Sequence, residues 1–387
     1  MNTISRKVAV VGIGETPYYR HGASPVPEFV LALDAIRAAA DDAGIDVREI
    51  DGFCSYSAER SDPVRLGAAL GLPDIAYSNM FWGGGGGGVC GAVANAAAAL
   101  AVGFCTYAVV YRSLAQGQFG RFGQAGRGSK VSGRAAYTAP YGVMTPAQHI
   151  ALRTRRFMHE HDVTDEAFCA VALAAYAHAQ RNPRAVMYGR PLTREKYYEA
   201  RMIAEPFRLY DCCLENDGAA AVLLTTSDRA GDLKQKPAYL LGAAQGTSPR
   251  YELNTHVNEH YASANFGTVA PRLFEQAGIT AAEVDVAQIY ENFTGAVVMS
   301  LVEHGFCAPD EVMEFCTPQN LTWSDGGLPI NTSGGNLAEC YMHGLELVTE
   351  AVRQIRGTSP CQVDGADMSL VAGGPASSPV SSLILCR

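Results

Sequence analysis

The chain has 387 residues, of which 48% are hydrophobic and 18% are charged, so it can bury a large core without disulfide staples. The formal net charge of −9 leaves no basic excess, which argues against nucleic acid or an anionic membrane surface as a partner. The 11 cysteines form no CxxC pair and their number is odd, so neither a disulfide framework nor a zinc site is indicated.

The first part of the chain contains two apolar segments. The run at 8–11 predicts a strand and is too short for a signal peptide. The Ala-rich stretch at 92–105 is too short to span a membrane and predicts a buried helix. With the isolated cysteines, these features lead us to expect a reducing, cytoplasmic location.

Two segments of the sequence repeat. Residues 43–51 (AGIDVREID) are similar to residues 277–285 (AGITAAEVD). Each copy follows an apolar pattern with helical period, carries a Gly suited to a left-handed helix cap, and precedes a strand-like run. The helices are expected at 29–42 and 269–276, and the strands at 52–56 and 286–290.

A looser similarity extends this duplication. Residues 83–103 and 334–357 both read as a glycine-rich entry to a helix that ends at Gly. We therefore expect an α/β fold of two βαβαβ-type halves, with stacked and largely parallel sheets between helical layers. The N-terminal half would comprise residues 1–236, with a loop and helical insertion at about 112–210, and the C-terminal half residues 237–387.

The insertion itself gives three local signals. Residues 112–141 are rich in Gly, Ser, Arg and Gln with little periodicity, which predicts a long loop. A capping box at Thr145 and Gln148 predicts a helix that runs to about His161. Residues 216–224 (NDGAAAVLL) predict a turn that leads into a buried strand.

Several segments resemble the thiolase superfamily, in particular its sterol-carrier and lipid-transfer branch. They span nearly the whole chain in the expected order: 8–16 (VAVVGIGET), 155–160 (RRFMHE), 216–224 (NDGAAAVLL) and 331–335 (NTSGG). The resemblance implies two related halves with stacked sheets, which agrees with the duplication, and an acyl-CoA substrate.

The four catalytic motifs of thiolases can be located, and the residues they need are replaced. The position of the nucleophilic Cys falls on Gly86, within the glycine run 83–88. The first His or Asn position has become Tyr290, and the His of the Gly-His-Pro motif has become Tyr341. The last Cys-containing motif has become 371–375 (VAGGP), which has no Cys.

This pattern resembles the steroid side-chain-cleaving aldolases of the lipid-transfer-protein type. The resemblance implies retro-aldol cleavage of a β-hydroxyacyl-CoA to a ketone and a short, propionyl-CoA-like thioester. Such a reaction needs a base, donors for the enolate oxygen and an acid, but no covalent Cys intermediate. We expect Tyr290 and Tyr341 to be the acid/base pair, with a phenol pKa lowered by a nearby donor or positive dipole.

Other residues are candidates for support at this site. Side chains that could orient a tyrosine or bind the substrate are His343, Asn292 and His256. Backbone N–H groups that could stabilise an oxyanion belong to Gly86, Gly373 and Gly374. Packing, or a solvated loop, would also account for the histidines, and close packing would account for the glycines. The functional interpretation of the glycines is that they make room for a bulky tertiary carbon.

Two further functions stay open at this point. Cys90 and Cys340 would permit thiolase-type acyl transfer, and a chain with an inactive site would be an acyl-CoA- or sterol-binding subunit. The resemblance also implies partners: a homodimer of thiolase-like subunits and a small zinc-ribbon/OB-fold protein that helps to hold the CoA ester. We expect zinc only in that partner, and no cofactor or metal in this chain.

Overall fold

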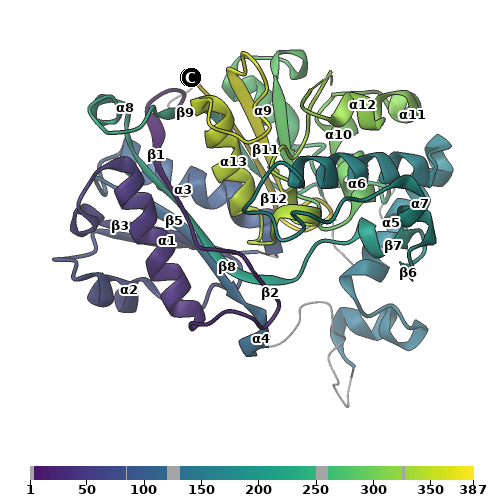
Figure 1. Cartoon of the computed structure of the whole chain (residues 1–387), viewed down its shortest axis with the longest axis horizontal. Helices are drawn as coiled ribbons and strands as arrows, with labels where there is room; N and C mark the ends of the chain where they lie inside the picture. Colours follow the sequence, from purple (N-terminus) through teal and green to yellow (C-terminus); the bar gives the residue numbers. More distant parts are fainter. Residues whose placement is uncertain (1–3, 84, 120–130, 250–259, 325–326) are drawn as a thin grey trace.

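A computed structural model describes residues 4–83, 85–119, 131–249, 260–324 and 327–387 of the chain (Figure 1). Its strands are β1 (Val8–Glu15), β2 (Tyr19–Arg20), β3 (Gly52–Tyr56), β4 (Tyr77–Phe81), β5 (Ala108–Ala115), β6 (Met202–Ala204), β7 (Phe207–Arg208), β8 (Asn216–Thr226), β9 (Ala238–Gly246), β10 (Val286–Ile289), β11 (Met368–Gly373) and β12 (Val380–Cys386). Its α-helices are α1 (Glu28–Ala43), α2 (Pro63–Leu70), α3 (Val89–Ala101), α4 (Gln116–Phe119), α5 (Pro146–His161), α6 (Asp165–Ala179), α7 (Arg194–Glu199), α8 (Ser227–Ala230), α9 (Val269–Ala277), α10 (Thr294–Glu303), α11 (Val312–Phe315), α12 (Pro318–Leu321) and α13 (Leu345–Arg356).

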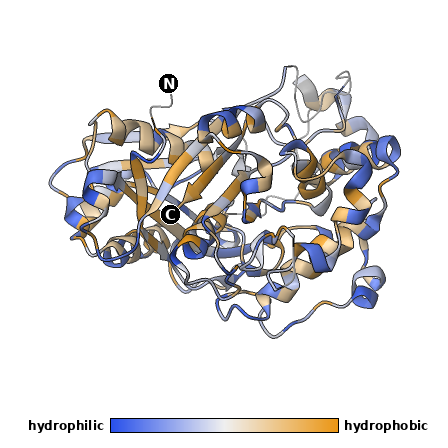
Figure 2. Ribbon diagram, turned by 90° about the horizontal axis from the view of Figure 1, so that it is seen from above, coloured by the Kyte–Doolittle hydropathy of each residue, from blue (hydrophilic) through white to orange (hydrophobic). Residues whose placement is uncertain are grey.

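The molecule is layered, and alternate residues of each central strand face different cores. In β1, Val8 and Val10 face an inner core with α3 and α13, whereas Ala9 and Val11 face an outer core with α1. In β12, Leu383 faces the inner core, whereas Ile384 faces an outer core with α9 and α10. The apolar colouring of the strands and inner helices in Figure 2 reflects this burial on both faces. The predicted α/β fold of two halves between helical layers is confirmed.

The two halves meet edge to edge. The strands follow the order β10-β11-β12-β9-β1-β8-β5-β3-β4, and β1 pairs with β9 only through Ala9–Tyr239 and Val10–Ala238. The predicted repeat is confirmed in detail, because α1 and α9 each end at a left-handed glycine, Gly44 (φ 79°) and Gly278 (φ 70°).

The prediction of largely parallel sheets is wrong. Parallel pairing joins β3 to β4 and β5, and β10 to β11, but β8, β9 and β12 run antiparallel to their neighbours. For β8 the reason lies in the insertion: it returns the chain to the end of β5, so that Asp217 at the start of β8 pairs with Ala115. An antiparallel neighbour follows from that return.

The insertion lies against the other half of the molecule. Its helices α5 and α6 pack on α10, and in Figure 1 they cover the right side of the C-terminal half. The capping box at Thr145 and Gln148 is present and α5 ends at His161, as predicted. The predicted loop at 112–141 is wrong at its start, because β5 continues through Ala115 in register with β8 and buries Arg112 completely. None of the helices in the described ranges is long and apolar enough to cross a lipid bilayer.

Candidate active site

Tyr290 and Tyr341 lie together in the inner core. Tyr290 directly follows β10, and Tyr341 follows the π-helical turn Gly335–Glu339. The Tyr290 hydroxyl donates to the Tyr341 hydroxyl at 2.7 Å, and the ring centroids are 5.9 Å apart. Both rings are buried, with exposed fractions of 2% and 9%. The sequence-predicted pair is therefore one hydrogen-bonded unit.

The ring of Tyr290 occupies the space above Gly86. A Cβ built on Gly86 would lie 2.1 Å from Cε2 of Tyr290, far inside van der Waals contact. Gly344 (φ 89°) approaches the same edge of this ring, because a Cβ built on it would lie 2.8 Å from Cδ2 of Tyr290. The room made by Gly86 is thus filled by a phenol ring and not left open for a tertiary carbon.

The other two predicted glycines pack against the same loop. A Cβ on Gly373 would lie 2.9 Å from the carbonyl oxygen of Gly86, and one on Gly374 (φ 64°) would lie 2.1 Å from the amide nitrogen of Gly87. Close backbone approach therefore accounts for glycine at these positions. Gly86 thus adjoins the Tyr290 ring, and Gly373 and Gly374 adjoin the backbone of Gly86 and Gly87.

Burial raises the pKa of both phenols well above the ordinary value. For Tyr290 the next contributions come from Tyr341 and Cys213, and for Tyr341 from Cys213. The positive charge of Arg112 lowers the pKa of Tyr341 only in part. The expected lowering of a phenol pKa is therefore absent, because burial outweighs the positive charge of Arg112.

Asn292 connects two loops of the site. Its Nδ2 donates to the carbonyl of Pro375 at 3.1 Å, and its carbonyl oxygen accepts from the amide of Cys213 at 3.1 Å. These contacts position the glycine loop beside Tyr290. His256, the third predicted supporting residue, lies outside the described residues.

His343 lies against Tyr341. The two ring centroids are 5.0 Å apart with the planes at 88°, an edge-on arrangement. Nδ1 of His343 faces two nitrogens of Arg112, at 3.0 and 3.2 Å. The structure thus brings this predicted supporting residue to the tyrosine pair, together with an arginine that sequence reasoning placed in a loop.

A network of buried carboxyl groups lies behind the tyrosines. Glu291 accepts from the amide of Asn336 at 2.6 Å, and the Asn336 side chain in turn donates to Glu346. Burial raises the pKa of Glu291 to about 8 and that of Glu346 well above its ordinary value. With its pKa at about 8, Glu291 is mostly protonated at neutral pH. In the sequence, the one signal for Glu291 and Glu346 is that each places a charge within an otherwise apolar pattern.

Three thiols lie near the site, and burial raises the pKa of each above the ordinary range. Cys90 donates to the carbonyl of Val371 at 3.5 Å inside the inner core, and Cys340 is completely buried beside Tyr18. Cys213, which sequence reasoning did not consider, is close enough to both phenols to raise their pKa. A neutral thiol is a weak nucleophile, so none of the three favours acyl transfer.

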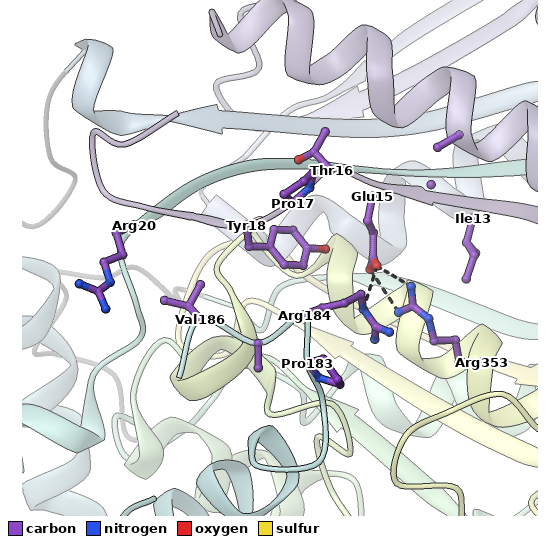
Figure 3. A pocket seen from close by; sticks show the side chains of 13 residues that line it. Ile13, Glu15, Thr16, Pro17, Tyr18, Arg20, Pro183, Arg184, Val186 and Arg353 are labelled. Atoms are coloured by element: carbon purple, nitrogen blue, oxygen red, sulfur yellow. Dashed lines mark hydrogen bonds and ion pairs between the residues drawn. The ribbon is translucent and has the colours of Figure 1, made fainter. Parts of the chain in front are cut away.

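A cavity of about 760 Å³ is lined by residues of β1 and the segment after it, by residues 183–186 and by Arg353 of α13 (Figure 3). Its wall contains Glu15, held between Arg184 and Arg353, an arrangement that outweighs burial and lowers the pKa of Glu15 to about 2. Tyr18 of this wall adjoins Gly218, as does the sulfur of Met342, the residue after Tyr341.

No metal site is found in the part of the chain that the structure describes: His, Cys, Asp and Glu nowhere gather there in threes with the geometry to hold an ion.

The chain is similar to known proteins over its whole length. The family described as thiolase C-terminal domain-like matches residues 251–387. Over 392 residues the chain is 37% identical to the 17-hydroxy-3-oxo-4-pregnene-20-carboxyl-CoA lyase of Mycobacterium tuberculosis, covering 99% of this chain and 100% of that protein. It is also 37% identical over 392 residues to a steroid side-chain-cleaving aldolase of Thermomonospora curvata, with 100% and 99% covered. A solved structure described as Ltp2-ChsH2(DUF35) aldolase superposes with a TM-score of 0.92 at 35% identity, covering 100% of this chain and 99% of that chain.

Proposed function

The chain belongs to the thiolase superfamily, within its steroid side-chain-cleaving aldolases, and is a carbon–carbon lyase; we propose that Tyr290 and Tyr341 carry its retro-aldol step. The substrate in this proposal is a β-hydroxyacyl-CoA with a tertiary alcohol on a steroid ring, and the products are a ring ketone and a short acyl-CoA such as propionyl-CoA. The observation that carries it is the 2.7 Å hydrogen bond between two buried phenols above Gly86.

The reaction moves a proton from the substrate hydroxyl to the enolate carbon, with no net uptake or release of protons. The substrate hydroxyl loses its proton, the carbon–carbon bond breaks to leave a ketone and a thioester enolate, and the enolate carbon gains a proton. A hydrogen-bonded pair of phenols can serve both ends: one phenol oxygen accepts the hydroxyl proton while the other phenol delivers its own to carbon. The proton that links the two oxygens shifts between them, which restores both phenols.

The raised pKa values define how this relay operates. A preformed phenolate is disfavoured in the buried site, so the phenols act as neutral donors and acceptors whose proton transfers are coupled. The enolate oxygen then needs its own donors. Backbone N–H groups of Gly86, Gly373 and Gly374 are the candidates in the loops that adjoin Tyr290, and His343 is a side-chain candidate.

We further propose that the chain functions as a homodimer with a small zinc-ribbon/OB-fold partner that helps to hold the CoA ester. The solved relative is described as an Ltp2 aldolase with ChsH2(DUF35), and the superposition covers the whole chain. Zinc in this proposal belongs to the partner, and the thioester is a substrate and not a resident cofactor.

The test is product analysis by mass spectrometry with the full chain, alone and coexpressed with such a partner. The probe is the thioester named in the mycobacterial relative, 17-hydroxy-3-oxo-4-pregnene-20-carboxyl-CoA. We expect a C17 ketone and propionyl-CoA without consumption of free CoA, and one deuterium on the α-carbon of propionyl-CoA in D₂O. Consumption of free CoA would indicate acyl transfer, and tight binding without products in the presence of the partner would indicate a binding subunit.

A further inference from the structure

We propose that Arg112 is a positioning residue that fixes His343 as a neutral imidazole with its hydrogen on Nε2, so that His343 acts as a hydrogen-bond donor and not as an acid or base. The role assigned to His343 in catalysis rests on the proposed function of the tyrosine pair. The tautomer itself rests only on the contacts of the described residues.

The geometry around Nδ1 determines where the hydrogen lies. Nε of Arg112 is 3.2 Å from Nδ1 of His343 and Nη2 is 3.0 Å away. A guanidinium has no acceptor, so both contacts require Nδ1 to accept through its lone pair. Neutral imidazole carries its one hydrogen on the other nitrogen, and a protonated ring would point an N–H at two further N–H groups.

Arg112 cannot turn away from this contact. Its Nη1 is 3.2 Å from Glu59 Oε2, and neither side chain is exposed to solvent. Glu59 also accepts from the amide and the hydroxyl of Ser113, at 2.8 and 3.0 Å. A buried ion pair is weak evidence for stability, since apolar residues of similar volume often do as well. The two nitrogens of Arg112 that do not contact Glu59, Nε and Nη2, face His343, so the ion pair has a role in holding that imidazole.

The backbone of His343 is held in an uncommon conformation. Its φ of 52° lies in the left-handed region, where a residue with a Cβ is strained unless its surroundings impose it. Tyr56 imposes it, because its hydroxyl lies 3.1 Å from the carbonyl of His343 and 3.3 Å from that of Met342. Residues of the N-terminal half thus hold both the ring and the backbone of a residue of the C-terminal half.

The charged surroundings agree with a neutral ring. Arg112 comes from β5, while Glu59 and Arg60 follow β3; Tyr341 comes from the ring's own loop and Tyr56 from β3. Arg60 itself is paired with Glu28 of α1 at 3.2 Å. Burial first, then Arg112 and Arg60, lower the pKa of His343 well below its ordinary value.

A fixed neutral donor suits the proposed reaction. A histidine that titrates near pH 7 could take the proton that must pass between the two phenols, and so divert it from the enolate carbon. With its hydrogen confined to Nε2, the imidazole can stabilise developing negative charge beside Tyr341 without exchanging a proton.

The direct test is nitrogen-15 NMR of the full chain labelled in its 9 histidines. Long-range proton–nitrogen spectra distinguish a protonated from an unprotonated ring nitrogen, and the His343→Gln variant identifies the signal. We expect Nδ1 to be unprotonated and Nε2 protonated, with no change between about pH 5.5 and 8.5. A hydrogen on Nδ1, or titration within this range, would overturn the proposal.

The second test removes the contact between Arg112 and His343. Glu59→Gln and Arg112→Met are made together, so that neither charge stays buried without its partner. The ring stays buried in this variant, so we expect His343 to remain neutral while both of its tautomers become populated, and kcat to fall. An unchanged tautomer would contradict a positioning role for Arg112. If the double variant does not fold, the spectra of the unmodified chain decide alone.

A third comparison tests whether His343 acts as a hydrogen-bond donor or only packs against its neighbours. His343→Gln keeps a side-chain N–H and should lose less kcat than His343→Phe, and equal losses would count against the donor role. If the unmodified chain fails to cleave the thioester, the proposed function fails, while the NMR result for the tautomer is unaffected.

Discussion

The Tyr290 hydroxyl donates its hydrogen to the Tyr341 hydroxyl, with 2.7 Å between the two oxygens, and both rings are buried. Removal of either oxygen breaks the only direct path for a proton between them. We expect Tyr290→Phe and Tyr341→Phe each to lower kcat by about 10²- to 10⁴-fold, with loss of about 1 kcal/mol of stability from the hydrogen bond. Steady-state kinetics and chemical unfolding measure the two effects.

Tyr176→Phe is the matched control for this pair. Tyr176 is a buried tyrosine of α6 that packs edge-on against Tyr210, away from the site. It should retain near-normal kcat. If the Tyr290 and Tyr341 variants both turn over like this control, the phenols are not the acid and base.

The contact between Gly86 and Tyr290 makes a second prediction. Gly86→Ala places a Cβ 2.1 Å from Cε2 of the ring, so either the ring or the glycine loop must move. We expect a loss of about 1–3 kcal/mol of unfolding free energy, in the range of overpacked cores, together with a large loss of kcat. Gly231→Ala is the control, because its φ is −69° and no atom lies within 4 Å of a built Cβ. Full activity of Gly86→Ala would show that the Tyr290 ring does not need its present position.

The buried Glu291 makes stability fall as pH rises. Its pKa is raised from 4.5 to about 8, so between these values the folded chain keeps a proton that the unfolded chain releases. The stability associated with this group is complete below about pH 4.5 and is lost as pH rises to about 8. Glu291→Gln removes this dependence while keeping an acceptor for the Asn336 amide.

Urea unfolding at a series of pH values between about 5 and 8 measures this effect. The unfolding free energy of Glu291→Gln should fall less steeply with pH than that of the unmodified chain, by a total on the order of a few kcal/mol. Buried carboxyl groups whose pKa Glu291 does not influence, such as Glu303, contribute equally to both proteins and cancel in the difference. Glu275→Gln, at an exposed position on α9, should leave the slope unchanged, and a Glu291 variant that behaves like it would contradict the buried proton.

The thiol of Cys213 discriminates between aldol cleavage and acyl transfer. It lies near both phenols, but burial keeps its pKa well above the ordinary value and it is therefore protonated. We expect Cys213→Ala, and likewise Cys90→Ala, to retain kcat within about tenfold, with no acyl-enzyme in intact-protein mass spectra. Loss of activity in Cys213→Ala, together with a thioester adduct on Cys213 of the unmodified chain, would reinstate acyl transfer.

Much of the fold could be predicted because its signals are local. The caps at Gly44 and Gly278, the helical periods before them and the capping box at Thr145 each depend on a few adjacent residues, and the structure has all of them. The tyrosine pair was located by its place in known motifs. That the two hydroxyls form a hydrogen bond could not be derived from that placement.

The unpredicted parts depend on contacts between distant segments. Arg112 lies in a stretch that reads as a polar loop, and only its pairing with β8, more than a hundred residues later, makes it a buried strand residue. Its contacts to Glu59 and His343 again join separate segments. The direction of β8 was misjudged for the same reason, since it depends on where a long insertion returns the chain.

The fit of the Tyr290 ring above Gly86 also bears on ancestry. A descendant that regained a cysteine at position 86 would collide with the ring, and one that first lost the ring would have neither phenol relay nor thiol. Under the proposed mechanism each single exchange removes one chemistry without supplying the other, so a cysteine at position 86 is compatible only with a smaller side chain at position 290.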